Sequence, residues 1–201
     1  METALIGNIY LDSKNGNPII KSKNNIFYSS FYFQDFYDDT LTKKFIKSTE
    51  RLIRSSKEYN NYLALLKTNY NILNYDNILS HIGTMDASIE MHHYPFTLYK
   101  IVEIVMSHHI VKKEFFTTFS LAKEVMNLHY AQKIGLVPLA ITNHELAHED
   151  ALFISTKQIF GQWEDFYSEY QDGLSQSDIS YINSIKNMSL KNVASDSKGI
   201  Y

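Results

Sequence analysis

Histidine carries most of the capacity for chemistry in this chain of 201 residues. All eight histidines fall in its middle part, at His81, His92, His93, His108, His109, His129, His144 and His148. An imidazole ring binds divalent metals, and in its neutral form it can take up a proton as a general base. Cysteine is absent, which excludes disulfides and thiolate metal sites. A metal ion would therefore need His, Asp, Glu or Asn ligands, and residues 81–148 are the segment that can supply them.

Two of these histidines, His144 and His148, are spaced for joint metal binding. They stand four apart in the stretch HELAH, and residues four apart lie on one face of a helix. A working site also needs a third ligand and an open position for water or substrate. That ligand could come from a downstream glutamate or from the pair His92 and His93, or it could be missing.

A downstream glutamate would complete the H-E-x-x-H pattern of zinc metallopeptidases. In that hypothesis Glu145 is the general base, and Glu164 or Glu169 is the third ligand. We also expect Thr142 and Glu145 to form a capping box, with Thr142 as the N-cap of the helix. A capping glutamate would fold back toward the helix start and away from metal-bound water, which weakens the peptidase hypothesis.

The pair His92 and His93 lies at the exit of a predicted strand. In residues 89–93 the apolar Ile89 and Met91 alternate with polar residues, and a proline follows shortly, which indicates a short strand. The segments that follow are predicted to be a helix over 97–109 capped by Thr97, a helix from Thr117 or Thr118 to Gly135, a very short strand over 135–139, and the helix with HELAH.

The outer parts of the chain carry weaker signals. We predict extended or irregular structure over 1–37, one long helix or two consecutive ones over 41–68, helices within 155–170 and 178–190, and a polar tail over 192–201. The fold class is therefore α+β, mostly helical. With 44% apolar and 20% charged residues, the composition is that of an ordinary globular protein. No run of 18 apolar residues occurs, so we expect a cytoplasmic protein with no membrane association.

One basic stripe contrasts with the overall charge of −3. Lys43, Lys47, Arg51 and Arg54 recur at helical spacing, on the side away from the apolar face of 41–68. The usual role of such a stripe is a solvated helix face. The functional alternative is contact with the phosphates of DNA.

The histidine pattern resembles the HNH or ββα-metal (His-Me finger) endonucleases of phage type. In the colicin-type DNases of that family, an adjacent histidine pair at a strand exit is followed by a spacer and by H-x-x-x-H on a helix. His92 with His93, and His144 with His148, take these places here. The segment GLVPLAITNHELAH is also similar to the family ending L-V-P-L-C-x-x-C-H-x-x-x-H, with Ala140 and Asn143 where two cysteines often stand.

The resemblance implies an assignment for each of these histidines. His93 would be the general base, and His92, His144 and His148 would bind one divalent metal, Mg²⁺ in first place with Mn²⁺ or Zn²⁺ as alternatives. Two features depart from the family. The central Asn of the colicin-type pattern falls on Gly135 here, and the spacer is so long that two helices must be inserted between the strands.

On this basis the expected architecture is a small β-hairpin plus helix metal core (ββα-metal) with helical additions. Residues 81–160 would form the core, 1–80 an N-terminal extended segment and basic helical region, and 161–201 C-terminal helices and the polar tail. The expected function is metal-dependent nicking or cleavage of DNA by a phage-encoded protein in the host cytoplasm or the virion. A non-catalytic virion-associated or binding protein on the same fold, and the zinc peptidase, stay open as alternatives, as does the oligomeric state.

Overall fold

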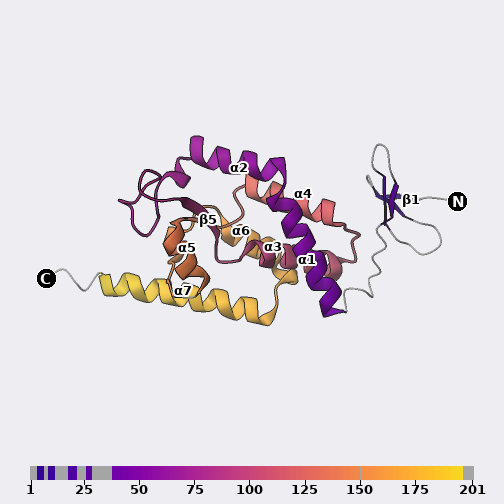
Figure 1. The fold of residues 1–201 in the computed structure, drawn as a ribbon. Coiled ribbons are helices and arrows are strands. Elements are labelled where there is room, and N and C mark those ends of the chain that lie inside the picture. The colour runs from indigo at the N-terminus through magenta and orange to yellow at the C-terminus, as the bar shows by residue number, and fades with distance from the viewer. Residues whose placement is uncertain are drawn as a thin grey trace.

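The computed structural model of the chain describes residues 4–6, 9–11, 18–21, 26–28, 38–149 and 151–196, and it describes side chains over 38–149 and 151–190. In these residues the chain is mostly helical, with two small antiparallel sheets (Figure 1). The predicted α+β, mostly helical class is therefore confirmed.

The N-terminal strands form a sheet of their own. They are β1 (Ala4–Ile6), β2 (Ile9–Leu11), β3 (Pro18–Lys21) and β4 (Ile26–Tyr28). Each pairs antiparallel with the next along the chain. β-Branched and aromatic residues favour such strands, and the predicted extended structure is present in the described parts of 1–37.

The predicted helical segment 41–68 is two helices, α1 (Asp39–Arg54) and α2 (Lys57–Thr68). The side chain of Asp38 caps α1 by accepting from the N–H groups of Thr40 and Leu41. Helix α1 ends and α2 begins here because Ser56 caps the new helix. The Ser56 hydroxyl accepts a hydrogen bond from the Tyr59 N–H at 3.0 Å.

Two strands and one helix carry the histidines that were predicted as metal ligands. β5 (Ile89–His93) pairs antiparallel with β6 (Leu136–Ala140), and α5 (Ile141–His148) begins at the residue after β6. Between the strands lie α3 (Leu98–Lys112) and α4 (Thr118–Tyr130). The predicted insertion of two helices and the predicted caps Thr97 and Thr117 are confirmed. Helix α4 ends at Tyr130, before the predicted Gly135.

The C-terminal part contains α6 (Trp163–Glu169) and α7 (Gln176–Asp196). Short 3₁₀ turns are η2 (Ile72–Asn74), η3 (Thr156–Gln158) and η4 (Gln171–Gly173). The predicted helix in 155–170 starts only at Trp163, because Phe160 pairs with Leu136 as an isolated bridge. Helix α7 continues through residues predicted as tail to Asp196, and 197–201 lie outside the described residues.

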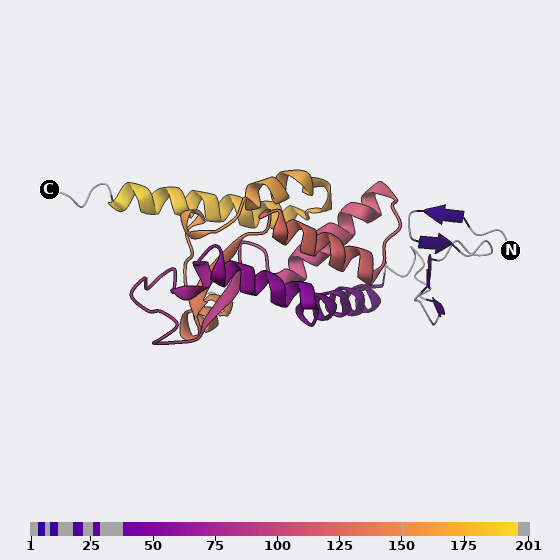
Figure 2. The ribbon, with the colours of Figure 1, turned by 90° about the horizontal axis from the view of Figure 1, so that it is seen from above.

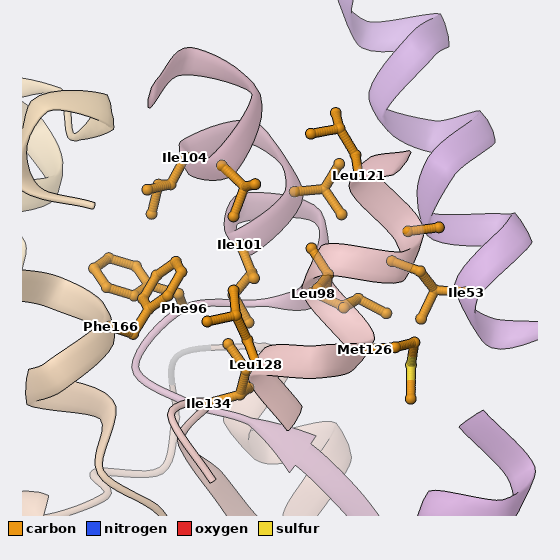
Figure 3. Packing of buried hydrophobic residues seen from close by; sticks show 14 of the residues in the cluster. Ile53, Phe96, Leu98, Ile101, Ile104, Leu121, Met126, Leu128, Ile134 and Phe166 are labelled. Atoms are coloured by element: carbon orange, nitrogen blue, oxygen red, sulfur yellow. The ribbon is translucent and has the colours of Figure 1, made fainter. Parts of the chain in front are cut away.

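The β5–β6 hairpin separates two hydrophobic clusters. On one face, Ile89 and Met91 pack against the main core. This core joins α1, α2, α3, α4, α6 and part of α7, and Figure 3 shows part of it. On the other face, Val137 and Leu139 pack with Ile154 in a smaller cluster. Alternate residues of a strand point to opposite faces, so each strand residue is assigned to one of these two environments. Figures 1 and 2 show α5 beside this hairpin and α1 further along the molecule.

Candidate metal site

Three histidines from the hairpin and its helix meet at one point. Potential ligand atoms of His92, His144 and His148 all lie within 4.8 Å of one another. In the part of the chain that the structure describes, no other group of three or more His, Asp or Glu residues is gathered this closely. Zinc bonds of 2.0–2.1 Å in a tetrahedral site place ligand nitrogens about 3.3 Å apart. The Nε2 atoms of His144 and His148 are 3.2 Å apart.

Strand alternation carries His92 to this point. Glu90 and His92 lie opposite Leu139 and Val137 in the sheet, on the face covered by α5. The His92 ring centroid is 5.1 Å from that of His144 and 5.0 Å from that of His148. The structure therefore brings together the three residues that were predicted as metal ligands.

Glu90 orients the ring of His144. The Nδ1–H of His144 donates to Oε2 of Glu90 at 2.6 Å. This hydrogen bond fixes the tautomer in which Nε2 of His144 carries no proton, so its lone pair could bind an ion in place of its hydrogen bond with Nε2 of His148. A carboxylate behind a ligating histidine is a common arrangement in metal sites, where it positions the ring and raises its basicity.

His92 has a buried ring nitrogen that lacks a hydrogen-bond partner within the described residues. This nitrogen is Nδ1. Burial, followed by repulsion from His144 and His148, lowers the pKa of His92 to about 4. The ring is therefore neutral at pH 7, as a metal ligand must be, and binding an ion would offset the cost of burying it.

Asp76 fixes the start of helix α5. This buried carboxylate accepts from the Ala140 N–H at 2.5 Å and from the Asn143 amide at 3.0 Å. Its other oxygen accepts from the N–H groups of Ile78 and Leu79. Burial alone would raise the pKa of Asp76, but these hydrogen bonds together lower it. Asp76 therefore stays charged and holds the first turn of α5 against the end of β6.

The predicted capping box at Thr142 and Glu145 is wrong. Helix α5 begins at Ile141, so Thr142 lies inside its first turn, and the N-cap residue is Ala140, with no side-chain cap. Glu145 is exposed. The capping role that the sequence predicts would count against Glu145 as a peptidase base. Since Glu145 does not cap the helix, that objection no longer applies.

The glutamates considered as third ligands lie elsewhere. Glu164 pairs with Lys186 at 2.8 Å, and Glu169 pairs with Lys133 at 2.5 Å. The position that either would have filled is occupied by His92. A site of the glutamate-liganded peptidase type is therefore not what the structure assembles.

His93 points away from the metal site. It shares the core face of β5 with Ile89 and Met91, and its ring lies parallel to that of Tyr59. His129 donates from Nδ1 to the Val125 carbonyl at 2.7 Å, so its Nε2 accepts from the Nε2–H of His93 at 3.0 Å. Burial, then the charges of His129 and Arg54, holds the pKa of His93 well below its ordinary value. His93 contributes to the lining of the cavity beside the cluster, but its Nε2 is hydrogen-bonded to His129 and it is not one of the three grouped ligands.

Gly135 has a structural role where the family pattern has an asparagine. A Cβ atom at this position would lie 2.1 Å from the Tyr94 carbonyl oxygen and 3.0 Å from Cβ of Trp163. The Tyr94 N–H also donates to the Gly135 carbonyl at 3.0 Å. Only glycine permits this close approach of the two strands.

The basic stripe is an exposed face of α1. Lys43, Lys47, Arg51 and Arg54 are all exposed, and Arg54 pairs with Glu50 at 3.0 Å. The first three, with Lys44, line a hollow of about 470 Å³ and form no ion pair with the residues that the structure describes. The stripe is on α1, whereas the three histidines are on β5 and α5, and Figure 1 shows α1 well apart from α5.

A cavity of about 510 Å³ adjoins the histidine cluster. His92 and His148 form part of its wall, together with the end of β5, residues 151–154 and one face of α7. Its volume lies in the range of small-molecule sites.

Sequence reasoning missed Glu90 and Asp76. Glu90 stands two residues before His92, and strand alternation alone places both on one face. Asp76 carries no comparable signal, because its partners Ala140 and Asn143 are remote in sequence.

Among the described residues, no helix combines the length and the apolar character needed to cross a membrane.

Comparison with known proteins adds the biological setting. No curated protein and no solved structure matches this chain. The family described as bacteriophage G278-like virion protein matches residues 2–199, nearly the whole chain. The chain therefore belongs to the bacteriophage G278-like virion protein family.

Proposed function

We propose that this member of a virion protein family binds a divalent transition metal, zinc in first place, through His92, His144 and His148. The observation that carries the proposal is the convergence of three imidazole rings, one of them already oriented by Glu90. The bound ion would join strand β5 to helix α5 and so stabilise a small hairpin in a non-catalytic virion component. A structural metal contributes directly to the stability of the fold that holds it.

The donor set favours zinc over the expected magnesium. Mg²⁺ prefers six oxygen ligands in octahedral geometry and usually keeps several waters. Three neutral imidazole nitrogens suit Zn²⁺, and a three-histidine set leaves a further coordination position open. The resemblance to the HNH family implies Mg²⁺ first, whereas the ligand chemistry of these residues supports Zn²⁺.

Metal binding can be tested on the full chain by equilibrium dialysis and thermal unfolding. We expect one Zn²⁺ per chain, with a stabilisation of about 2.7 kcal/mol when free zinc exceeds the dissociation constant a hundredfold. His144→Ala should abolish both effects. His81→Ala is the matched control, because His81 is exposed and lies outside the cluster. A zinc effect that persists in His144→Ala would overturn the proposal.

A second candidate is the metal-dependent endonuclease. It is supported by the order of the ligands on a strand–strand–helix unit. A metal would supply Lewis-acid activation of water and of the scissile phosphate. The ligands would be the same, but His93 would hold the hairpin in place and would take no proton from water. The basic stripe of α1 would contact the DNA backbone.

Plasmid nicking with Zn²⁺, Mn²⁺ or Mg²⁺ separates the two candidates. A nuclease built on this site should lose nicking in His144→Ala and retain it in His93→Gln. Replacing Lys43 and Lys47 by Ala should lower the salt dependence of DNA binding by about one unit for each phosphate that is no longer bound. No nicking with any metal would favour the non-catalytic protein, whereas casein cleavage that disappears in Glu145→Gln would restore the peptidase hypothesis.

A further inference from the structure

The cavity beside the histidine cluster has walls of unusual chemistry for a nucleic-acid site. Its described lining contains no Lys, Arg, Asp or Glu. The lining combines apolar side chains such as Leu152, Ile154 and Ile185 with hydroxyl-bearing side chains such as Thr97, Ser184 and Tyr181. A run of phosphates needs cationic partners along its path, and the described residues of this cavity offer none.

One wall of the cavity belongs to helix α7. Tyr181, Ser184 and Met188 follow the helical spacing of a single face, and all three line the cavity. The side chains of Tyr181 and Met188 are large and apolar, yet they are 44% and 46% exposed. An apolar ligand in the cavity would cover this face.

The lining of the cavity also contains two of the three proposed metal ligands. His92 and His148 line the cavity, whereas His144 is turned toward Glu90. A ligand in the cavity would therefore lie next to the ion. Three neutral imidazoles leave the charge of a divalent ion uncompensated, so a single anionic group at that position is electrostatically favoured.

We infer that the cavity is a binding site for a ligand with one anionic metal-binding group, of the carboxylate class, joined to an apolar body. The anionic group binds the ion held by the three histidines, and the apolar body packs between residues 151–154 and α7. This inference rests on the proposed metal site and adds its ligand class. It selects against a polyanionic strand as the occupant of the cavity.

Two hydroxamates that differ only in the body provide the test. The full-length protein is loaded with Co²⁺, whose visible absorption reports its ligands, and is titrated with acetohydroxamate and with hexanohydroxamate. Burying two of the four extra methylenes corresponds to a gain in affinity of about tenfold. We expect at least that preference for hexanohydroxamate.

Tryptophan substitutions on α7 locate the effect. Ser184→Trp should fill the cavity and abolish the preference, with Co²⁺ affinity unchanged. Asn183→Trp is the matched control, because Asn183 is exposed on the same helix and does not line the cavity. Equal affinities for the two hydroxamates, or a preference that survives Ser184→Trp, would overturn the ligand class and leave the metal site standing. Failure to bind Co²⁺ would overturn both.

Discussion

His92 and His93 are neighbours in one strand and equally buried, each with 6% exposed surface, yet they lie in opposite environments. His93 faces the main core, where its ring nitrogen is hydrogen-bonded to His129. His92 faces α5, where its Nδ1 has no partner among the described residues and two further imidazoles lie close by. For both rings burial is the largest cause of a lowered pKa. Burial and a perturbed pKa therefore do not identify the site, whereas an unsatisfied ring nitrogen beside other potential ligands does.

The largest loss of stability is expected at Gly135, because both faces of the β5–β6 hairpin depend on its close backbone contact with Tyr94. Gly135→Ala would place Cβ 2.1 Å from the Tyr94 carbonyl oxygen, directly after His93. The strands must separate to relieve this clash, so we expect a loss of about 3 kcal/mol in the free energy of unfolding, together with loss of zinc binding. Urea denaturation measures the first and dialysis the second.

Gly83→Ala is the control for that substitution. Its Cβ would lie 3.1 Å from the Tyr75 ring and 3.3 Å from the Asn74 carbonyl oxygen, and a shift of a few tenths of an ångström relieves both contacts. If Gly83→Ala and Gly135→Ala unfold at the same urea concentration, the close approach at Gly135 does not hold the hairpin together.

The next effect separates the two histidines directly. His93→Ala should cost about 2–4 kcal/mol, because it leaves a cavity in the core and an unpaired Nε2 on buried His129. In metal-free protein, His92→Ala should cost less than about 1 kcal/mol, since it removes a buried nitrogen that has no hydrogen-bond partner in the described part of the chain. Urea unfolding in the presence of a chelator gives both values. Equal losses would mean that the two faces do not differ as described.

A smaller effect is expected behind the ligands. Glu90→Gln weakens the hydrogen bond that orients His144, and loss of such a partner lowers metal affinity by about tenfold or more. Competition with a chromophoric chelator measures this change. Glu145→Gln serves as the control. Glu145 is exposed on α5, the helix of His144, so this substitution should leave metal affinity unaltered. A tenfold loss of metal affinity in Glu145→Gln, and not in Glu90→Gln, would mean that the Glu145 carboxylate interacts with the metal site.

The smallest effect concerns His109, a partly buried histidine with the opposite surroundings. Its Nδ1 and Nε2 lie 2.7 Å from carboxylate oxygens of Glu114 and Glu124, so both nitrogens must carry protons to donate. The hydrogen bond to Glu124 is the largest cause of its raised pKa. The resulting stability is complete below pH ~6.5, the ordinary histidine value, and disappears as pH rises through the raised pKa of the folded state.

We therefore expect the free energy of unfolding of the wild type to exceed that of His109→Gln by about 1 kcal/mol at pH 6. This difference should decrease toward pH 9. Urea unfolding across this range measures it. His93 and His129 are lowered in pKa, so their contribution changes with the opposite sign and is lost as pH falls below ~6.5. A difference at His109 that grows with pH would contradict the charged pairing.

Local patterns were sufficient to predict much of the fold. Alternation in 89–93 predicted β5, and Thr97 and Thr117 predicted the starts of α3 and α4, because these signals act within a few residues. The start of α5 could not be predicted in this way. Its first turn is held by Asp76, which lies 64 residues from Ala140 in the sequence, and no rule of local spacing contains that contact.

The site was predicted in part for the same reason. His144 and His148 share a helix face by spacing alone, and a strand exit brought His92 into consideration. The sequence did contain a signal against His93, since the alternation that predicts the strand assigns His93 to the same face as Ile89 and Met91. The family pattern outweighed that signal. The same alternation places Glu90 on the face of His92, so the role of Glu90 could also have been predicted from the sequence.

The insertion of α3 and α4 between the two strands has a consequence for folding kinetics. The backbone hydrogen bonds inside each helix join residues four apart, whereas pairing of β5 with β6 must close the loop that contains both helices, and such long-range contacts form slowly. His92 reaches His144 and His148 only when this pairing is complete. Zinc would then bind after the rate-limiting step, so raising its concentration should slow unfolding while leaving the folding rate almost unchanged.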